Sequence, residues 1–302
     1  TLGNIKELLK TTYSEHVRSE LGDFGGVYNL NGNHLVSSID GVGTKTDFVD
    51  TYFSNEYESL GKDIVNHSIN DILVMGAVPL FFLDYYGTSQ LDHIQFTSFI
   101  RGASQALCVD TDTTIPLIGG ETAEMPSVYK WEKNDIVGCI IGKLDNTFVN
   151  FPRQPISGDY LLGIKSTGPH TNGFSLINKI DWSQSLINTK FDNINVNDFL
   201  EQLKQPHFNY LPLIKQFLYT YGNTSIIRMC HITGGGLHEN LQRVIPSDIS
   251  LDLNNDSLEA VYPQWCNIIE TIGNVSKEEM YRVFNCGIGF VIIVDKYIRD
   301  MV

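Results

Sequence analysis

Ser37-Ser-Ile-Asp-Gly-Val-Gly-Thr-Lys45 is the most informative stretch of this chain, because it places a carboxylate, two glycines, a hydroxyl and an ammonium within residues 40–45. Two apolar residues before it indicate the end of a strand. Glycines let the backbone approach a bulky anion, and amides in such a turn can point at phosphate oxygens. Asp40 can hold Mg²⁺, and Lys45 can neutralise phosphate charge. The stretch matches neither standard glycine-rich phosphate pattern, so an ordinary turn is the alternative.

The composition is that of an ordinary globular protein. The chain has 302 residues, 42% hydrophobic and 19% charged, which is enough for two domains with separate cores. The formal charge of −14 argues against binding to nucleic acid or to an anionic membrane. An anionic substrate therefore needs local help from lysines, backbone amides or a bound cation. No apolar run in the sequence approaches the length of a membrane span.

The five cysteines indicate a reducing compartment. They are odd in number, far apart and free of C-x-x-C spacing. We therefore expect reduced, mostly buried thiols in a cytoplasmic protein, rather than a disulfide framework or a cysteine-based zinc site.

Strand and helix patterns alternate along the chain. In the first half we predict a short helix and then strands and two long helices, at 5–10, 34–39, 59–75, 80–86, 93–108, 115–118 and 136–141. In the second half we predict further strands and helices, at 160–164, 173–180, 197–204, 208–221, 224–230, 237–244 and 288–294. A polar stretch with two prolines separates the halves at 145–157. The sequence thus predicts an α/β fold with domains at 1–145 and 146–302.

Four polar residues lie on one stripe of the predicted helix 59–75. Asp63, His67, Asn70 and Asp71 share this stripe, while apolar side chains occupy the opposite side. A solvent-facing edge is one interpretation. However, a solvated face usually carries Lys and Glu, whereas Asn and Asp are poor helix formers and oppose the macrodipole near a C-terminus. This pattern favours a bound ligand, and Asn70 and Asp71 beside Asp40 would supply oxygens for Mg²⁺.

Gly119-Gly-Glu-Thr-Ala-Glu-Met125 directly follows the predicted strand at 115–118. A Gly-Gly pair at a strand end lets the backbone swing, so that Glu121 projects from the carboxyl edge of the sheet, where α/β folds bind ligands. A turn with a capping glutamate is the alternative.

Two glycine-rich segments of the second half each lead into a predicted helix. Ser166-Thr-Gly-Pro-His-Thr-Asn-Gly173 places His170, which can move a proton near neutral pH, at a helix start where anions bind. An incidental loop histidine is the alternative. His231-Ile-Thr-Gly-Gly-Gly236 follows a predicted strand, and its three glycines permit close backbone contact with a phosphate.

In this order and across the whole chain, these segments resemble the phosphoribosylformylglycinamidine cyclo-ligase family. The matching segments are Asp40-Gly-Val-Gly-Thr-Lys45, Asn70-Asp71, Pro79-Leu-Phe-Phe-Leu-Asp-Tyr-Tyr86, Gly119-Gly-Glu-Thr-Ala-Glu-Met-Pro126, Gly168-Pro-His-Thr-Asn-Gly173, His231-Ile-Thr-Gly-Gly-Gly236, Glu279-Met-Tyr281 and Phe284-Asn-Cys-Gly287. One of these motifs alone is weak, but so many in register are specific.

The resemblance implies a two-domain α/β protein whose N-terminal mixed sheets pair across a homodimer. It also implies de novo purine biosynthesis, in which ATP and formylglycinamidine ribonucleotide give aminoimidazole ribonucleotide, ADP and phosphate through a phosphorylated amide. ATP and Mg²⁺ are the implied cofactors, and the use of a monovalent cation stays open.

The resemblance further implies roles for individual residues. The catalytic candidates are His170, Lys45 and His231. The ATP-binding candidates are Lys6, Asp40, Gly41, Gly43, Thr44, Lys45, Asp63, Asn70 and Glu121. The nucleotide substrate would meet Asn172, Thr233, Gly234 and Gly235, and the metal ligands would be Asp40, Asp71 and Glu121.

The chain departs from the family pattern at three places. Gly22-Asp-Phe-Gly25 carries an acid where the family has a second glycine, Ile39 replaces a threonine, and Pro206-His-Phe208 replaces a Pro-Thr-basic segment. The family also extends beyond both Thr1 and Val302, so we expect the second domain to be truncated.

Two alternative functions remain on the sequence alone. One is another ATP-using enzyme of the same superfamily, although a selenophosphate synthetase would carry a reactive cysteine near its start and the first cysteine here is Cys108. The other is a non-catalytic nucleotide-binding relative, which the departure at Asp23 and the altered 206–208 segment favour.

Overall fold

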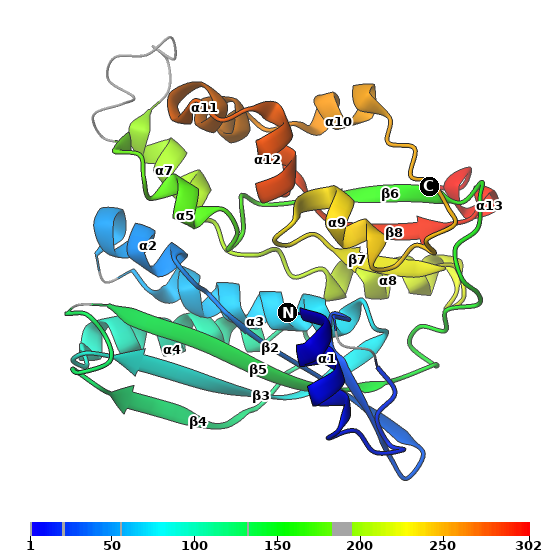
Figure 1. Ribbon diagram of the computed structural model, residues 1–302, viewed down its shortest axis with the longest axis horizontal. Coiled ribbons are helices and arrows are strands. Elements are labelled where there is room, and N and C mark those ends of the chain that lie inside the picture. Colours follow the sequence, from blue (N-terminus) through cyan, green and yellow to red (C-terminus); the bar gives the residue numbers. More distant parts are fainter. Residues whose placement is uncertain (1, 20–21, 55, 132, 183–194) are drawn as a thin grey trace.

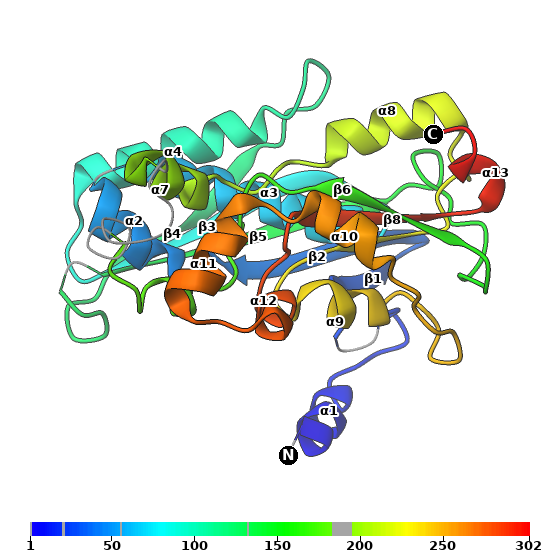
Figure 2. The ribbon, with the colours of Figure 1, turned by 90° about the horizontal axis from the view of Figure 1, so that it is seen from above.

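The computed structural model describes residues 2–19, 22–54, 56–131, 133–182 and 195–302, which form two α/β domains. Figure 1 shows the domains one above the other, with helix α3 (Glu58–Leu73) between the lower sheet and the upper domain. Helix α1 (Leu2–Lys10) stands away from the body in the view of Figure 2. The α/β class predicted from the sequence is confirmed. In the described part of the chain, no helix has both the length and the apolar character needed to cross a bilayer.

The first domain is built on a five-stranded mixed sheet of order β1-β2-β5-β3-β4, in which only β3 and β4 pair in parallel. Its strands are β1 (Gly26–Leu30), β2 (Asn33–Gly41), β3 (Ala77–Thr88), β4 (Leu117–Glu124) and β5 (Asn134–Leu144). The strands predicted at 34–39, 80–86 and 136–141 are confirmed, whereas the strand predicted at 115–118 overlaps β4 only at residues 117 and 118. Strand β1 is an additional strand that the sequence analysis missed.

Strand β4 corrects the expectation that residues 119–121 form a turn at a strand end. The strand continues through both glycines to Glu124. A Cβ on Gly120 would lie 2.1 Å from Oδ1 of Asp84 on β3. Glycine is therefore required by this close contact between neighbouring strands, and the backbone does not swing away from the sheet.

Helices α3 and α4 (His93–Leu107) cover one face of this sheet (Figure 1). They pack closely, because a Cβ on Gly102 would lie only 1.9 Å from the backbone oxygen of Glu58. Ile64, Ile69 and Ile72 of α3 are fully buried. Helix α2 (Lys45–Phe53), which the sequence analysis did not predict, begins directly after the glycine-containing turn.

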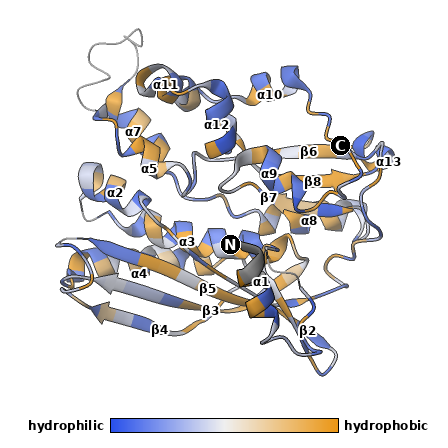
Figure 3. Cartoon of the chain, in the orientation of Figure 1, coloured by the Kyte–Doolittle hydropathy of each residue, from blue (hydrophilic) through white to orange (hydrophobic). Residues whose placement is uncertain are grey.

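The second domain contains a three-stranded antiparallel sheet of order β6-β8-β7. Its strands are β6 (Tyr160–Lys165), β7 (Arg228–His231) and β8 (Ile288–Val294), and its helices are α5 (Phe174–Ile177), α7 (Val196–Lys204), α8 (Leu211–Tyr221), α9 (Gly236–Gln242), α10 (Asn255–Val261), α11 (Gln264–Gly273), α12 (Lys277–Val283) and α13 (Lys296–Arg299). Figure 3 shows β8 as almost entirely hydrophobic and α12 as largely hydrophilic. The segment between Leu144 and Tyr160 contains neither helix nor strand.

The polar stripe of α3 forms the junction between the domains. Asn66 Nδ2 donates to the backbone oxygen of His207 at 2.8 Å. Asn70 Nδ2 donates to the backbone oxygen of Phe208 at 2.9 Å, and Asn70 Oδ1 accepts from the backbone N–H of Tyr210 at 3.1 Å. The stripe is buried rather than solvent-facing, because it satisfies the backbone of the extended segment 205–210.

A buried ion pair completes the junction. Lys45 Nζ lies 2.6 Å from Asp63 Oδ2 and donates to the backbone oxygen of Gln205 at 2.8 Å. Both side chains of the pair are fully buried. Burial lowers the pKa of Lys45 and, against the attraction of Lys45, raises the pKa of Asp63 to about 6. Each group thus depends on the other to stay charged.

Replacing one partner should be far more damaging than replacing an exposed lysine. Lys45→Met leaves the carboxylate of Asp63 buried without its cation, so we expect the free energy of unfolding to fall by about 3–5 kcal/mol in urea denaturation. Lys62→Met is the matched control, because Lys62 pairs with Glu58 at the surface and should cost less than about 1 kcal/mol. Adding Asp63→Asn to Lys45→Met should recover part of the loss; equal losses for the two lysine variants would contradict the argument.

Candidate active site

A cavity of about 540 Å³ lies between the two domains. The first domain contributes the end of β2 and the turn that follows it, and the second contributes the start of α5 and the loop before α9. Its lining residues are Asp40, Gly41, Val42, Gly43, Thr44, His67, Thr171, Asn172, Gly173, Phe174, Ser175, Thr233, Gly234 and Arg243. Gly43 has φ +65°, a left-handed conformation that glycine adopts without strain. The walls combine a glycine turn, hydroxyls and the guanidinium of Arg243, which suits a polar, anionic ligand.

The turn is fixed to the second domain by two hydrogen bonds. The hydroxyls of Thr44 and Ser175 lie 3.2 Å apart, and Asn178 Nδ2 donates to the backbone oxygen of Thr44 at 2.7 Å. The cavity is therefore assembled only when the domains are docked.

Two carboxylates meet at His67, which lines the cavity together with Asp40, while Asp71 is buried. His67 Nε2 lies 3.0 Å from Asp40 Oδ2 and 3.4 Å from Asp71 Oδ2. Asp71 also accepts from Ser38 Oγ at 3.1 Å and lies 2.9 Å from His231 Nδ1. The sequence prediction that Asp40 and Asp71 lie close together is confirmed, and an imidazole stands between them.

The two carboxylates favour the protonated form of His67, and the positive charge of His67 in turn favours the ionised form of each carboxyl group. Burial alone would lower the pKa of His67, but Asp71 and Asp40 outweigh burial and raise it to about 10. Burial opposes ionisation of Asp71 and Asp40 as well, yet the interactions with His67 hold the pKa of each below its ordinary value. The two carboxylates therefore hold one positive charge between them.

The other residues predicted to belong to the site either line the cavity, line an adjoining hollow or are buried. Asn172, Thr233, Gly234, Thr44 and the turn glycines line the cavity, as stated above. Gly235 lines an adjoining hollow beside Glu239 and Arg282. His170 and His231 are completely buried behind the cavity wall.

Three predicted ATP-binding residues are engaged elsewhere. Lys45, Asp63 and Asn70 are buried in the domain junction, where their polar atoms contact protein groups rather than the cavity. Asp63 and Asn70 were predicted to contact ligand because the sequence does not reveal that the segment 205–210 covers their face of α3. Lys6 lies on α1, but its side chain is outside the described part of the structure.

Glu121 is not brought to the other candidates within this chain. It lies exposed on the edge strand β4, and strands β3 and β5 separate it from Asp40 on β2. Three strand spacings correspond to roughly 14 Å, too far for shared ligation of one ion. Its predicted role in metal or ATP binding would need a second copy of the chain.

The sequence analysis missed Thr171, Ser175 and Arg243 among the lining residues. Thr171 Oγ1 lies 3.3 Å from His67 Nδ1, on the side of the ring away from the carboxylates. Arg243 supplies a cation to the cavity from the end of α9. A single arginine at a helix end carries no signal in sequence, because its role depends on the domain docking.

The His67 geometry predicts a specific pH dependence in protein kept free of metal by a chelator. A raised pKa means that the proton stabilises the folded state fully below pH 6.5, and that this stabilisation is lost as the pH rises through 10. Across that window we expect the free energy of unfolding to fall, on the order of 5 kcal/mol more in the wild type than in His67→Gln. His93→Gln, at an exposed position on α4, is the control. Identical pH profiles for wild type and His67→Gln would refute the assignment.

Comparison with known proteins gives matches to both domains. Residues 22–144 match the family described as AIR synthase related protein, N-terminal domain, and residues 157–300 match the corresponding C-terminal domain. A curated phosphoribosylformylglycinamidine cyclo-ligase of Prochlorococcus marinus (strain MIT 9215) is 35% identical over the whole chain and 86% of its own length. The cyclo-ligase of Xylella fastidiosa (strain 9a5c) is 39% identical over 96% of this chain and 81% of its own.

Solved structures share the fold at low sequence identity. "AaThiL complexed with AMPPCP and TMP" aligns with a TM-score of 0.61 and 16% identity, over 98% of this chain and 85% of that one. "Hydrogenase Maturation Protein HypE in complex with ATP" aligns with a TM-score of 0.56 and 16% identity, over 90% and 72%. These two likenesses concern the fold alone, whereas the curated relatives match in sequence from end to end. The chain therefore belongs to the phosphoribosylformylglycinamidine cyclo-ligase family.

Proposed function

We propose that this protein is an ATP-dependent cyclo-ligase that closes the ring of formylglycinamidine ribonucleotide to give aminoimidazole ribonucleotide, ADP and phosphate. The observation that carries this proposal is the sequence likeness of 35–39% to curated cyclo-ligases over nearly the whole chain. The cavity at the domain junction adds support, because polar groups from both domains converge on it. We also infer a cytoplasmic location, since all five cysteines are unpaired.

The reaction asks for positioning and for charge neutralisation. An amide oxygen is a poor leaving group, so the formyl oxygen first receives the terminal phosphoryl group of ATP. The substrate's own nitrogen then attacks that carbon, forming a C–N bond as the C–O bond breaks and phosphate leaves. Two anionic molecules must lie side by side for this sequence. Arg243 and the backbone amides of Gly43 and Thr44 are groups of the cavity that can oppose their charge, whereas the N–H groups of residues 41 and 42 are bonded within the protein.

The same cavity wall suits Mg²⁺. Asp40 and Asp71 already face one positive charge, that of His67, and Mg²⁺ prefers carboxylates together with substrate phosphates. Asp40 is the accessible member of the pair, with 49% of its side chain exposed. When bound, Mg²⁺ would neutralise charge on the triphosphate. His67, with Thr171 beside its other nitrogen, can release its proton or swing aside as the ion arrives.

The decisive experiment measures ring closure directly. Purified protein is mixed with formylglycinamidine ribonucleotide, ATP and Mg²⁺, and aminoimidazole ribonucleotide is followed through its aromatic amine. We expect ADP and ring product in equal amounts, and no ATP hydrolysis without the nucleotide substrate. ATP binding without product would contradict the proposal and indicate a non-catalytic relative.

The same assay includes a variant of the cavity wall. Asp71→Asn keeps the size of the side chain but removes its charge, so we expect turnover to fall at least about 100-fold while circular dichroism stays unchanged. Asp248→Asn, at an exposed loop position, is the matched control and should retain activity. Full activity in Asp71→Asn would remove Asp71 from the metal site.

We further propose that the chain forms a homodimer through the open face of its first sheet. Strand pairing places Ile39, Cys139 and Leu83 side by side on the face away from α3 and α4. Val137 and Tyr85 pair next to them on the same face, and Ile39 is 71% exposed. An apolar sheet face of this extent normally has a partner.

Sedimentation equilibrium at micromolar concentration tests the dimer. We expect a dimer for the wild type and a monomer for Ile39→Glu, which places a charge in the apolar face. Tyr219→Glu is the control, because Tyr219 is 92% exposed on α8 in the other domain. A monomeric wild type would refute the proposal.

A further inference from the structure

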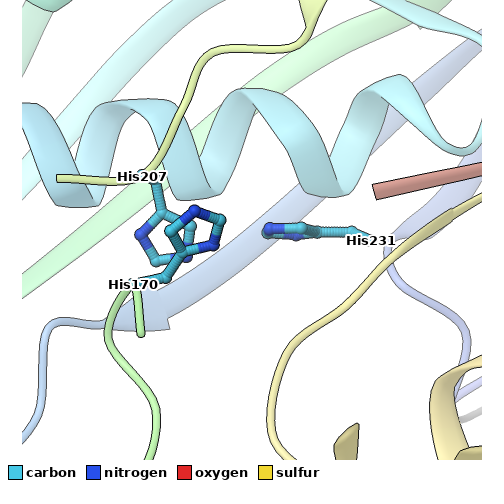
Figure 4. Close-up of side chains that lie close together, drawn as sticks. All are labelled: His170, His207 and His231. Atoms are coloured by element: carbon cyan, nitrogen blue, oxygen red, sulfur yellow. The ribbon is translucent and has the colours of Figure 1, made fainter. Parts of the chain in front are cut away.

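Three buried histidines from separate segments of the second domain face one another at the junction. His170 precedes α5, His207 follows α7, and His231 ends β7. Figure 4 shows His170 and His207 stacked, with the ring edge of His231 directed at the pair. The ring centroids of His170 and His207 are 4.2 Å apart, and one nitrogen from each of the three rings lies within 4.8 Å of the others.

Carboxylates of α3 set the orientation of two of these rings. His207 Nδ1 lies 3.0 Å from Asp63 Oδ1, and His231 Nδ1 lies 2.9 Å from Asp71 Oδ1. In both contacts the ring Nδ1–H donates to the carboxylate, which leaves Nε2 as a free lone pair. A carboxylate behind the histidine is the usual arrangement at zinc sites, because it fixes the tautomer and the ring direction.

The remaining ring nitrogens lack partners. Within the described part of the chain, Nε2 of His207, Nε2 of His231 and both nitrogens of His170 are buried without a hydrogen bond. A buried polar atom without a partner is costly, so four at one place call for a ligand.

We propose that His170, His207 and His231 bind a divalent transition-metal ion, with Zn²⁺ as the best match. Three neutral imidazoles and an open fourth position form a known type of zinc site. Imidazole favours Zn²⁺, Co²⁺ or Ni²⁺ over Mg²⁺, which prefers oxygen ligands. This site therefore differs in chemistry from the carboxylate pair of Asp40 and Asp71.

Two of the three histidines are close in sequence to residues that line the cavity. Thr171 follows His170 directly, Thr233 lies two residues after His231, and both threonines line the cavity. Zn–N bonds of about 2.0–2.1 Å in a tetrahedral arrangement place the nitrogens roughly 3.3 Å apart. To reach this arrangement the nitrogens must move closer together, and one of the stacked rings of His170 and His207 must turn so that both in-plane lone pairs point at the ion. The sequence analysis noted His207 only as a departure from the family pattern, and this histidine completes the set of three.

Metal binding is tested without reference to enzymatic activity. Apo protein is titrated with Co²⁺ and with Zn²⁺ in excess Mg²⁺, which blocks oxygen-rich sites. Calorimetry and the absorption of four-coordinate Co²⁺ report the binding. We expect one ion per chain, and a dissociation constant at least about 100-fold weaker in His207→Asn. Asparagine can still donate to Asp63, but it lacks the Nε2 ligand.

Two further variants keep the result interpretable. His170→Asn removes a second ligand at a position with φ +63°, which asparagine tolerates, and should weaken binding equally. His93→Asn, at the surface, should bind as the wild type does. Unchanged affinity in His207→Asn would overturn the proposal and place the ion at the alternative cluster of His67, Asp71 and His231. Absence of any Co²⁺ or Zn²⁺ binding would overturn it as well.

Discussion

The burial of the polar stripe of α3 against the extended segment 205–210 is the constraint on which the rest of the structure depends. A helix cannot bury a carboxylate and two amides without partners, and an extended segment outside a sheet cannot bury its backbone without them. Asp63, Asn66 and Asn70 solve both problems at once. The contact fixes the second domain over the first sheet, and thereby brings its loops to the end of β2, where the cavity forms.

Much of the fold could be predicted from local patterns. Strand β8 is a continuous apolar run and α4 has a regular apolar period, and both were predicted within a residue of their observed bounds. Helices α2, α10, α11, α12 and α13 were missed, because each has no more than ten residues and is too short for a regular apolar period to stand out. The Gly-Gly of β4 was wrongly predicted to form a turn. Glycine also occurs within strands where two backbones approach closely, and the sequence does not distinguish the two cases.

Residues of the candidate site could be predicted only where both the type of side chain and its place in the sequence indicated a ligand. Asp40 after a strand and Asp71 on a stripe of poor helix formers both indicated a ligand, and they do converge. Lys45 shows the limit of that reasoning. A lysine after a glycine turn suits a phosphate equally well in sequence, but here the turn leads straight into α2, which directs the ammonium into the junction toward Asp63. Whether such a lysine binds a phosphate or forms a buried ion pair depends on the group that it contacts in the folded protein.

Asp71 links the two kinds of chemistry at this junction. One of its oxygens faces His67 and Ser38 beside the cavity, and the other accepts from His231 within the histidine cluster. A cation bound to Asp71 Oδ2 would make Oδ1 a weaker hydrogen-bond acceptor for His231. Conversely, a metal bound to His231 would make its Nδ1–H a stronger donor to Asp71. Because the coupling passes through one carboxylate, it must act in both directions with equal free energy. If both proposed sites bind their ions, the occupancy of either would therefore affect the affinity of the other.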